Sequence, residues 1–165
     1  MPEAATLRIT PVEDRAVWRV KSWAPEYAGG EQAVMLAGQR LPAPVGTTSP
    51  APFHVLCVGP AEWLVVQPSR NAPRLAGDGL AIVDLSDGIA SIDVRGSAVR
   101  EVLAAGCGLD LHPQRFPPGR CARTRLASIA VVVECLDEYS FELHVARSHA
   151  RYLTGWLADA AAGCV

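Results

Sequence analysis

The stretch Ile89-Ala-Ser-Ile-Asp-Val-Arg-Gly-Ser-Ala-Val-Arg-Glu-Val-Leu-Ala-Ala-Gly106 contains the two patterns from which the fold class follows. Over residues 89–95, apolar residues alternate with polar ones, which is typical of a strand that is buried on one face. After it, Ser97 is a suitable N-cap and Gly106 a suitable stop for a helix. The apolar face of this expected helix consists of Val99, Val102 and Leu103. A strand followed directly by an amphipathic helix predicts a fold that combines sheet and helix.

Downstream of this stretch, we expect three closely spaced strands at residues 121–127, 129–136 and 139–146. In the last of them, three apolar side chains point to one side, while Glu142 and His144 point to the other. A final helix is expected after Ser148, which we take as its cap. Its apolar residues recur at helical spacing, at Ala150, Leu153, Leu157 and Ala161.

Upstream of the same stretch, the pattern predicts a strand, a helix and a strand hairpin. The strand covers residues 17–23 and the helix covers residues 31–40. The hairpin has its strands at residues 53–58 and 62–66, and a loop and a further strand follow it at residues 67–79 and 80–85.

The two halves of the chain therefore show a similar order of elements, which we interpret as a diverged internal duplication of a strand, helix and hairpin. The predicted fold class is α+β, with helices packed across antiparallel sheets. Residues 1–16 match no pattern and are expected to be disordered. Residues 17–165 are expected to form a single domain, because a chain of 165 residues is long enough for one sizeable core.

The charge of the chain argues against several classes of partner. A formal net charge of −2 creates no overall field that would attract nucleic acid or an anionic membrane. The first residues lack the features of a secretory signal, and no apolar run is long enough for a membrane span, so we expect a soluble, cytoplasmic protein. Arginine supplies fourteen of the fifteen basic residues, which slightly favours a protein that docks on others.

Motifs for common active sites are missing from the sequence. It contains neither a Gly-rich phosphate loop nor a G-x-S-x-G elbow. The five cysteines are scattered without a C-x-x-C pair, and the four histidines lack the spacing of a metal site. We expect no metal, cofactor-binding or catalytic residues in this chain.

Two pairs of residues could still carry chemistry. Asp84 and Asp87 flank a turn, where they could act as acid and base or bind a cation, although stabilisation of the turn is the simpler interpretation. Glu142 and His144 could form a proton relay, although an exposed polar face of a strand would have the same pattern.

Four arginines gather in one segment of the sequence. They could form an anion pocket or a docking face, or they could lie on a solvated strand face. Two of them, two positions apart, are expected to share one face of their strand. The four residues of this possible partner interface are Arg115, Arg120, Arg123 and Arg125.

Several short motifs, in this order and spacing, resemble the gamma subunit of heterotetrameric sarcosine oxidase. The resemblance covers residues 18–157. The motifs are Gly59-Pro-Ala-Glu-Trp-Leu-Val-Val66, Val83-Asp-Leu-Ser-Asp87, Gly106-Cys-Gly-Leu-Asp-Leu-His112, Phe116-Pro-Pro-Gly-Arg-Cys-Ala-Arg-Thr124 and Phe141-Glu-Leu-His-Val-Ala-Arg-Ser148.

The resemblance implies a fold similar to the folate-binding domain of glycine-cleavage aminomethyltransferase. It also implies a non-catalytic subunit of a complex that oxidatively demethylates sarcosine to glycine. Its partners would be the alpha, beta and delta subunits, chiefly the large folate-binding one. Those subunits would hold FAD, FMN, NAD, tetrahydrofolate and zinc, and the four arginines would be candidates for docking. An isolated subunit with an exposed docking patch would be expected to self-associate.

Two other functions stay open at this point. The chain could be a stand-alone folate- or pterin-binding module, with Asp84, Asp87, Glu142 and His144 around the ligand. It could also be a small hydrolase or transferase that uses His144 and Glu142 as acid and base. The chain is too short for the extra domains of a complete aminomethyltransferase, and residues 119–124 lack the Lys-Gly-Cys-Tyr-x-Gly-Gln signature of the related iron–sulfur maintenance proteins.

Overall fold

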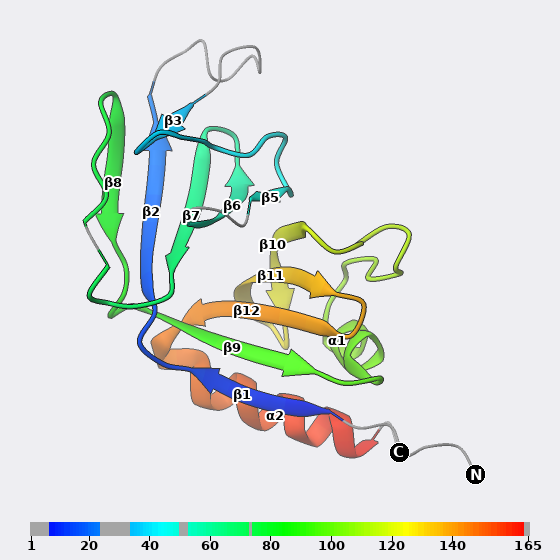
Figure 1. Cartoon of the computed structure of the whole chain (residues 1–165). Helices are drawn as coiled ribbons and strands as arrows, with labels where there is room; N and C mark the ends of the chain where they lie inside the picture. The colour runs from blue at the N-terminus through cyan, green and yellow to red at the C-terminus, as the bar shows by residue number, and fades with distance from the viewer. Residues whose placement is uncertain (1–6, 24–33, 50–52, 73, 164–165) are drawn as a thin grey trace. The chain divides into compact units, whose positions relative to one another are not determined.

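The computed structural model describes residues 7–23, 34–49, 53–72 and 74–163, which divide into two compact units (Figure 1). Unit 1 comprises Met1–Glu13 and Gly88–Val165, and unit 2 comprises Asp14–Asp87. Unit 2 is therefore an insertion between the first strand of unit 1 and the remainder of that unit. No helix among these residues is long and apolar enough to cross a membrane.

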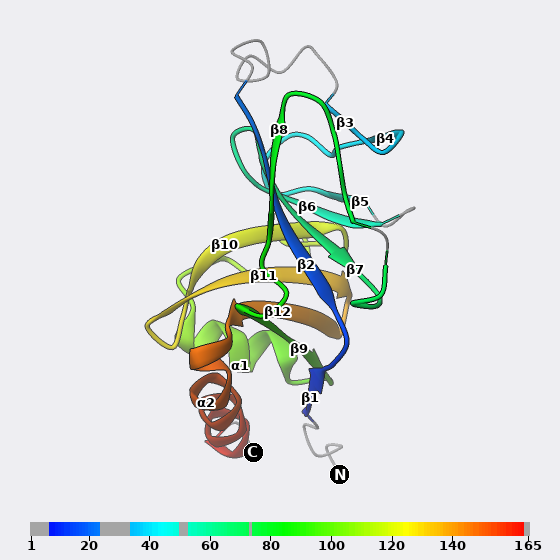
Figure 2. The same cartoon turned by 90° about the vertical axis from the view of Figure 1, so that its left-hand side faces the viewer.

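Unit 1 is built on a five-stranded antiparallel sheet with the strand order β1-β9-β12-β11-β10, accompanied by two α-helices (Figures 1 and 2). The strands predicted at residues 89–95, 121–127, 129–136 and 139–146 are confirmed to within one residue at each end. The elements are β1 (Arg8–Val12), β9 (Ile89–Arg95), α1 (Val99–Gly106), β10 (Arg120–Leu126), β11 (Ile129–Asp137), β12 (Ser140–Ala146), a 3-10 turn at Arg147–His149 and α2 (Ala150–Gly163).

The core of unit 1 lies between one face of this sheet and the two helices. Alternate residues of β9 and β12 point into it, and Phe141 and Leu143 lie directly opposite Val94 and Ile92 on the neighbouring strand. The helices contribute the apolar residues predicted from their spacing, and Leu153 and Leu157 are fully buried. Burying a leucine side chain stabilises the folded state by about 1.5–3 kcal/mol, so this contact fixes which face of the sheet the helices cover.

The N-cap of helix α1 lies one residue later than expected. The cap position is Ala98, which makes no side-chain hydrogen bond, and not Ser97. Ser148 likewise lies inside the 3-10 turn that precedes α2. Both helices are therefore held in place by their buried faces and not by side-chain capping at these serines.

Arg100 on α1 anchors the loop between α1 and β10. Its guanidinium group donates hydrogen bonds to the carbonyl oxygens of Leu111 and Phe116 in this loop, and to that of Glu138. The same group lies 4.9 Å from the ring centroid of Phe141, which stacks on Phe116. One arginine thus fixes a loop that has no regular structure of its own.

Unit 2 contains a second five-stranded antiparallel sheet with the order β5-β6-β7-β2-β8, and a separate two-stranded hairpin. The predicted strand pairing of residues 53–58 with 62–66 is confirmed, as are the strands at residues 17–23 and 80–85. The elements are β2 (Ala16–Ser22), β3 (Met35–Leu36), β4 (Gln39–Arg40), β5 (Thr48–Ser49), β6 (His54–Gly59), β7 (Glu62–Gln67) and β8 (Leu80–Asp84).

The helix predicted at residues 31–40 is wrong over residues 34–40, and residues 31–33 lie outside the described part. This segment is the hairpin of β3 and β4. Ala37 and Gly38 connect the two strands with φ angles of 45° and 81°, so both adopt the left-handed conformation of a two-residue hairpin turn. Leu36 and Gln39 are buried on either side of the turn, and this tertiary burial overrides the helical propensity of the segment.

Two expectations about the chain's organisation need correction. Both α-helices of the described chain belong to unit 1, so the structure does not have two equivalent strand-helix-hairpin halves. Arg8–Val12 forms strand β1, which pairs with β9, so at least this part of residues 1–16 is ordered. The coarser prediction of antiparallel sheets with helices is confirmed, and the described chain has two α-helices.

Candidate functional site

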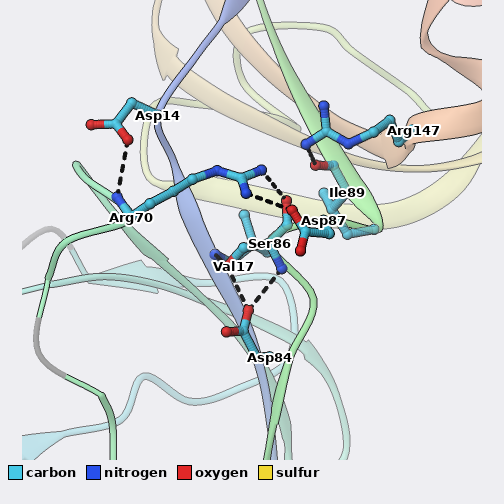
Figure 3. Close-up of polar contacts among 8 residues, drawn as sticks. All are labelled: Asp14, Val17, Arg70, Asp84, Ser86, Asp87, Ile89 and Arg147. Carbon is cyan, nitrogen blue, oxygen red and sulfur yellow. Dashed lines mark hydrogen bonds and ion pairs between the residues drawn. The ribbon is translucent and has the colours of Figure 1, made fainter.

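The turn that contains Asp84 and Asp87 is stabilised by its own polar groups (Figure 3). The Asp84 carboxylate accepts hydrogen bonds from the backbone N–H and the hydroxyl of Ser86, at 2.9 and 2.6 Å. These bonds, from the hydroxyl first and the N–H second, lower the pKa of Asp84. The Ser86 hydroxyl oxygen in turn accepts a bond from the Val17 N–H. The geometry is that of an Asx turn, as the simpler sequence interpretation has it.

Asp87 belongs to a network that ties together the two ends of unit 2 (Figure 3). Arg70 forms an ion pair of 2.5 Å with Asp87 and donates a hydrogen bond to the Ser86 carbonyl oxygen. The backbone N–H of Arg70 and the hydroxyl of Ser69 both donate to Asp14. Asp14 and Asp87 are the first and last residues of the unit. We call this group of residues, Asp14, Ser69, Arg70, Ser86 and Asp87, the Arg70 clamp.

Glu142 and His144 lie on the face of the unit 1 sheet opposite to the helices. Cross-strand pairing places His144 opposite Ser91, and Glu142 opposite Asp93 on one side and Glu134 on the other. The simpler sequence interpretation, an exposed polar face, is wrong here, because Glu134, Glu142 and His144 are 1%, 6% and 3% exposed. The sequence allowed this face to be recognised by alternation, but it contained no signal for its burial.

The arrangement around His144 does not suit a proton relay. The Ser91 hydroxyl lies 2.9 Å from Nδ1 of His144, and the Glu142 carboxylate lies 4.0 Å from the same nitrogen. In a serine nucleophile system, the hydroxyl and the carboxylate contact different nitrogens of the ring, so that the ring can pass a proton between them. Here both groups meet one ring atom. If the ring were flipped, Cδ2 would take the position of Nδ1, and Ser91 and Glu142 would still face one ring atom. The relay geometry is therefore not restored by a flip.

The structure separates the four arginines that are close in sequence. Arg123 and Arg125 lie on β10 and share one exposed face, as predicted. Arg120 points to the other face of the same strand, and Arg115 is exposed in the preceding loop. Arg123 and Arg125 line an open groove with Gly108, Leu109 and Thr124. The alternation of the strand identified this pair, while the turn at residues 108–109 that faces it could not be foreseen.

Nothing in the described part of the chain resembles a metal site, since no three His, Cys, Asp or Glu side chains there converge in a way that could hold an ion. The cysteines that the structure describes are thiols. Burial raises the pKa of Cys57 and of Cys135, which keeps both of them neutral.

Comparison with known proteins identifies the family. Residues 38–163 match the model of the sarcosine oxidase, gamma subunit family. The sarcosine oxidase subunit gamma of an Arthrobacter species is 30% identical in an alignment of 144 residues, which covers 82% of this chain and 71% of that protein. The corresponding subunit of Corynebacterium sp. strain P-1 is 31% identical over 81% of this chain and 70% of its own.

Solved structures show the same fold. A chain of heterotetrameric sarcosine oxidase from Corynebacterium sp. U-96, in complex with pyrrole 2-carboxylate, superimposes with a TM-score of 0.83 at 24% identity, over 99% of this chain and 87% of that one. Glycine cleavage system aminomethyltransferase T from Bartonella henselae has a TM-score of 0.65 at 12% identity, over 93% of this chain and 45% of that one. The expected similarity to the aminomethyltransferase fold is thus confirmed. The protein belongs to the sarcosine oxidase, gamma subunit family.

Proposed function

We propose that the chain is a non-catalytic structural subunit of a heterotetrameric sarcosine oxidase. The observation that carries this proposal is the match to the gamma subunit family over residues 38–163, which include most of unit 2 and nearly all of the second segment of unit 1. Its partners would be the alpha, beta and delta subunits, chiefly the large folate-binding subunit. The complex would reside in the cytoplasm, and residues 17–165, together with strand β1, would act as one gamma-subunit-like domain.

The chemistry would take place in the partner subunits. They would demethylate sarcosine oxidatively to glycine, produce peroxide and pass the one-carbon unit to tetrahydrofolate, using FAD, FMN, NAD and zinc. The role of this chain would be assembly and support. The geometry around His144 favours this division of labour, because Ser91 and Glu142 contact the same ring nitrogen and cannot exchange a proton through the ring.

A second candidate is a stand-alone folate- or pterin-binding module, which the likeness to the aminomethyltransferase fold favours. Of the four residues named for such a ligand, Asp84 and Asp87 already have partners within the protein. Asp84 is occupied by Ser86, and Asp87 by Arg70. This occupation argues for the structural role.

The test is co-expression of the chain with the other three subunits, followed by affinity purification through a tag on this chain. We expect a yellow complex that produces peroxide when sarcosine is added, and loss of that complex when this chain is omitted. His144→Ala is the matched variant, and its complex should remain as active as the parent. A chain that purifies alone and binds tetrahydrofolate in a calorimeter would support the folate module instead.

A further inference from the structure

The groove beside strand β10 has a single sign of charge. It is lined by Gly108, Leu109, Arg123, Thr124 and Arg125, and we call it the arginine groove. Two guanidinium groups line it, and no carboxylate does. Both arginines are exposed, while Leu109 is partly buried against the core of unit 1. The groove therefore combines positive charge with one apolar side chain.

The spacing of the two arginines selects the shape of a ligand. They are two residues apart on a strand, so their side chains leave the same face about 7 Å from each other. Carboxylates at alternate positions of another extended chain have the same spacing. An extended segment with Asp or Glu at every second residue could therefore meet both arginines at once, and arginine is the cation best suited to such paired contacts.

The groove is preformed, because its two walls are joined. The backbones of Cys107 and Leu126 form an isolated antiparallel β-bridge, and the N–H of Ala127 donates a hydrogen bond to the Gly106 carbonyl oxygen at 3.1 Å. Arg125 is itself oriented by a hydrogen bond to the Ser128 carbonyl oxygen, at 2.7 Å. A rigid site needs less ordering on binding, which favours affinity.

We propose that the arginine groove binds an extended acidic segment of a partner subunit, with carboxylates at alternate positions. The inference rests on the proposed function and adds to it the place on this chain and the chemistry of the partner. Arg115 and Arg120 take no part in the contact, because they are not among the residues that line the groove.

The experiment measures the affinity of this chain for the complex of the other three subunits, at 50 and 300 mM NaCl. The test variant is R123E/R125E, and the matched control is R40E/R151E, which makes the same change in net charge at two other exposed arginines. We expect the test variant to bind about 100-fold more weakly at low salt, and the control to bind within a factor of about three of the parent. High salt should weaken the parent and bring it towards the test variant.

Further variants keep the test decisive. R123Q/R125Q replaces R123E/R125E if the latter does not fold, as judged by circular dichroism. R123K/R125K should recover part of the affinity, because lysine keeps the positive charge but lacks the planar guanidinium group that makes paired contacts. Unchanged affinity of the glutamate or glutamine variant would overturn the arginine groove and leave the assembly role intact. The arginine groove would also be overturned if the variant lost affinity only because it self-associates. Charges on an edge strand prevent aggregation, so their removal could have that effect without any contact to a partner. Failure of the parent itself to bind the other subunits would overturn both proposals.

Discussion

Replacing Gly106 by alanine should reveal how closely the two helices of unit 1 approach each other. Gly106 is the last residue of α1, and a Cβ atom at this position would lie 2.4 Å from Cη2 and 2.5 Å from Cζ2 of the Trp156 ring on α2. It would also lie 3.2 Å from the backbone nitrogen of Ala127. The ring would have to move by about 1 Å to restore an ordinary contact distance between carbon atoms.

Two opposing effects set the magnitude. Alanine is favoured over glycine inside a helix by about 1 kcal/mol, which alone would stabilise the variant. Overpacking a filled contact costs about 1–3 kcal/mol. The clash outweighs the gain, so we expect Gly106→Ala to lower the free energy of unfolding by up to about 2 kcal/mol and the melting temperature by up to about 8 °C.

The assay is urea unfolding of a double-mutant cycle with Trp156→Ala. Without the indole ring, Gly106→Ala should become neutral or should stabilise the protein by up to about 1 kcal/mol, so that its destabilising effect disappears. The matched control is Gly155→Ala in α2, since a Cβ atom there would meet nothing within 4 Å. If Gly106→Ala destabilised the protein equally with and without the indole, contact between the helices could not be the cause.

Three other predictions concern single side chains. Arg100→Met should lower the free energy of unfolding by about 2–4 kcal/mol in urea titrations, because three carbonyl oxygens lose a charged donor, and Arg100→Lys should restore less than half of the loss. Gly38→Ala should cost about 1 kcal/mol through backbone strain alone, because its φ angle is 81°, and Gly38→Asn should cost less; thermal melts of both variants test this. The hydrogen bonds from Ser86 lower the pKa of Asp84 in the folded state. Their contribution to stability is therefore complete above the ordinary pKa of an aspartate, about 4. It is lost as the pH falls through the lower pKa of the folded state. Since Asp84 is exposed, the effect should stay below about 1 kcal/mol, and Asp84→Asn should flatten the stability curve between pH 5 and 2 in acid titrations, whereas an unchanged curve would contradict the assignment.

The parts of the fold that followed from the sequence are those with a local, periodic signal. Strand β9 and helix α1 could be placed because Ile92 and Val94 alternate, and because Val102 and Leu103 share a helical face. The hairpin at residues 35–40 could not, because Ala37 occupies a left-handed conformation that alanine seldom adopts. Strand β1 was missed for a different reason, since its partner β9 lies some 80 residues away and no local pattern encodes that pairing.

The candidate sites followed the same division. The shared face of Arg123 and Arg125 could be predicted from a period of two, and so could the common face of Glu142 and His144. The approach of Ser91 to the same ring nitrogen as Glu142 depends on a cross-strand register that the sequence does not state. The burial of that second pair has no local signal in the sequence either. Arg70 carried no signal at all, because its role comes from reaching both ends of unit 2.

The Arg70 clamp also bears on the order in which the chain folds during synthesis. Strand β1 can pair with β9 only after the chain has been made as far as Ser91, the partner of Val12. Closing a flexible loop of roughly 80 residues costs about 4 kcal/mol in chain entropy. If unit 2 folds first, the clamp brings Asp14 and Asp87 together while the rest of the chain is still being made. The loop that β1 then has to close is only a few residues long. The insertion thereby turns a slow, long-range strand pairing into a nearly local one.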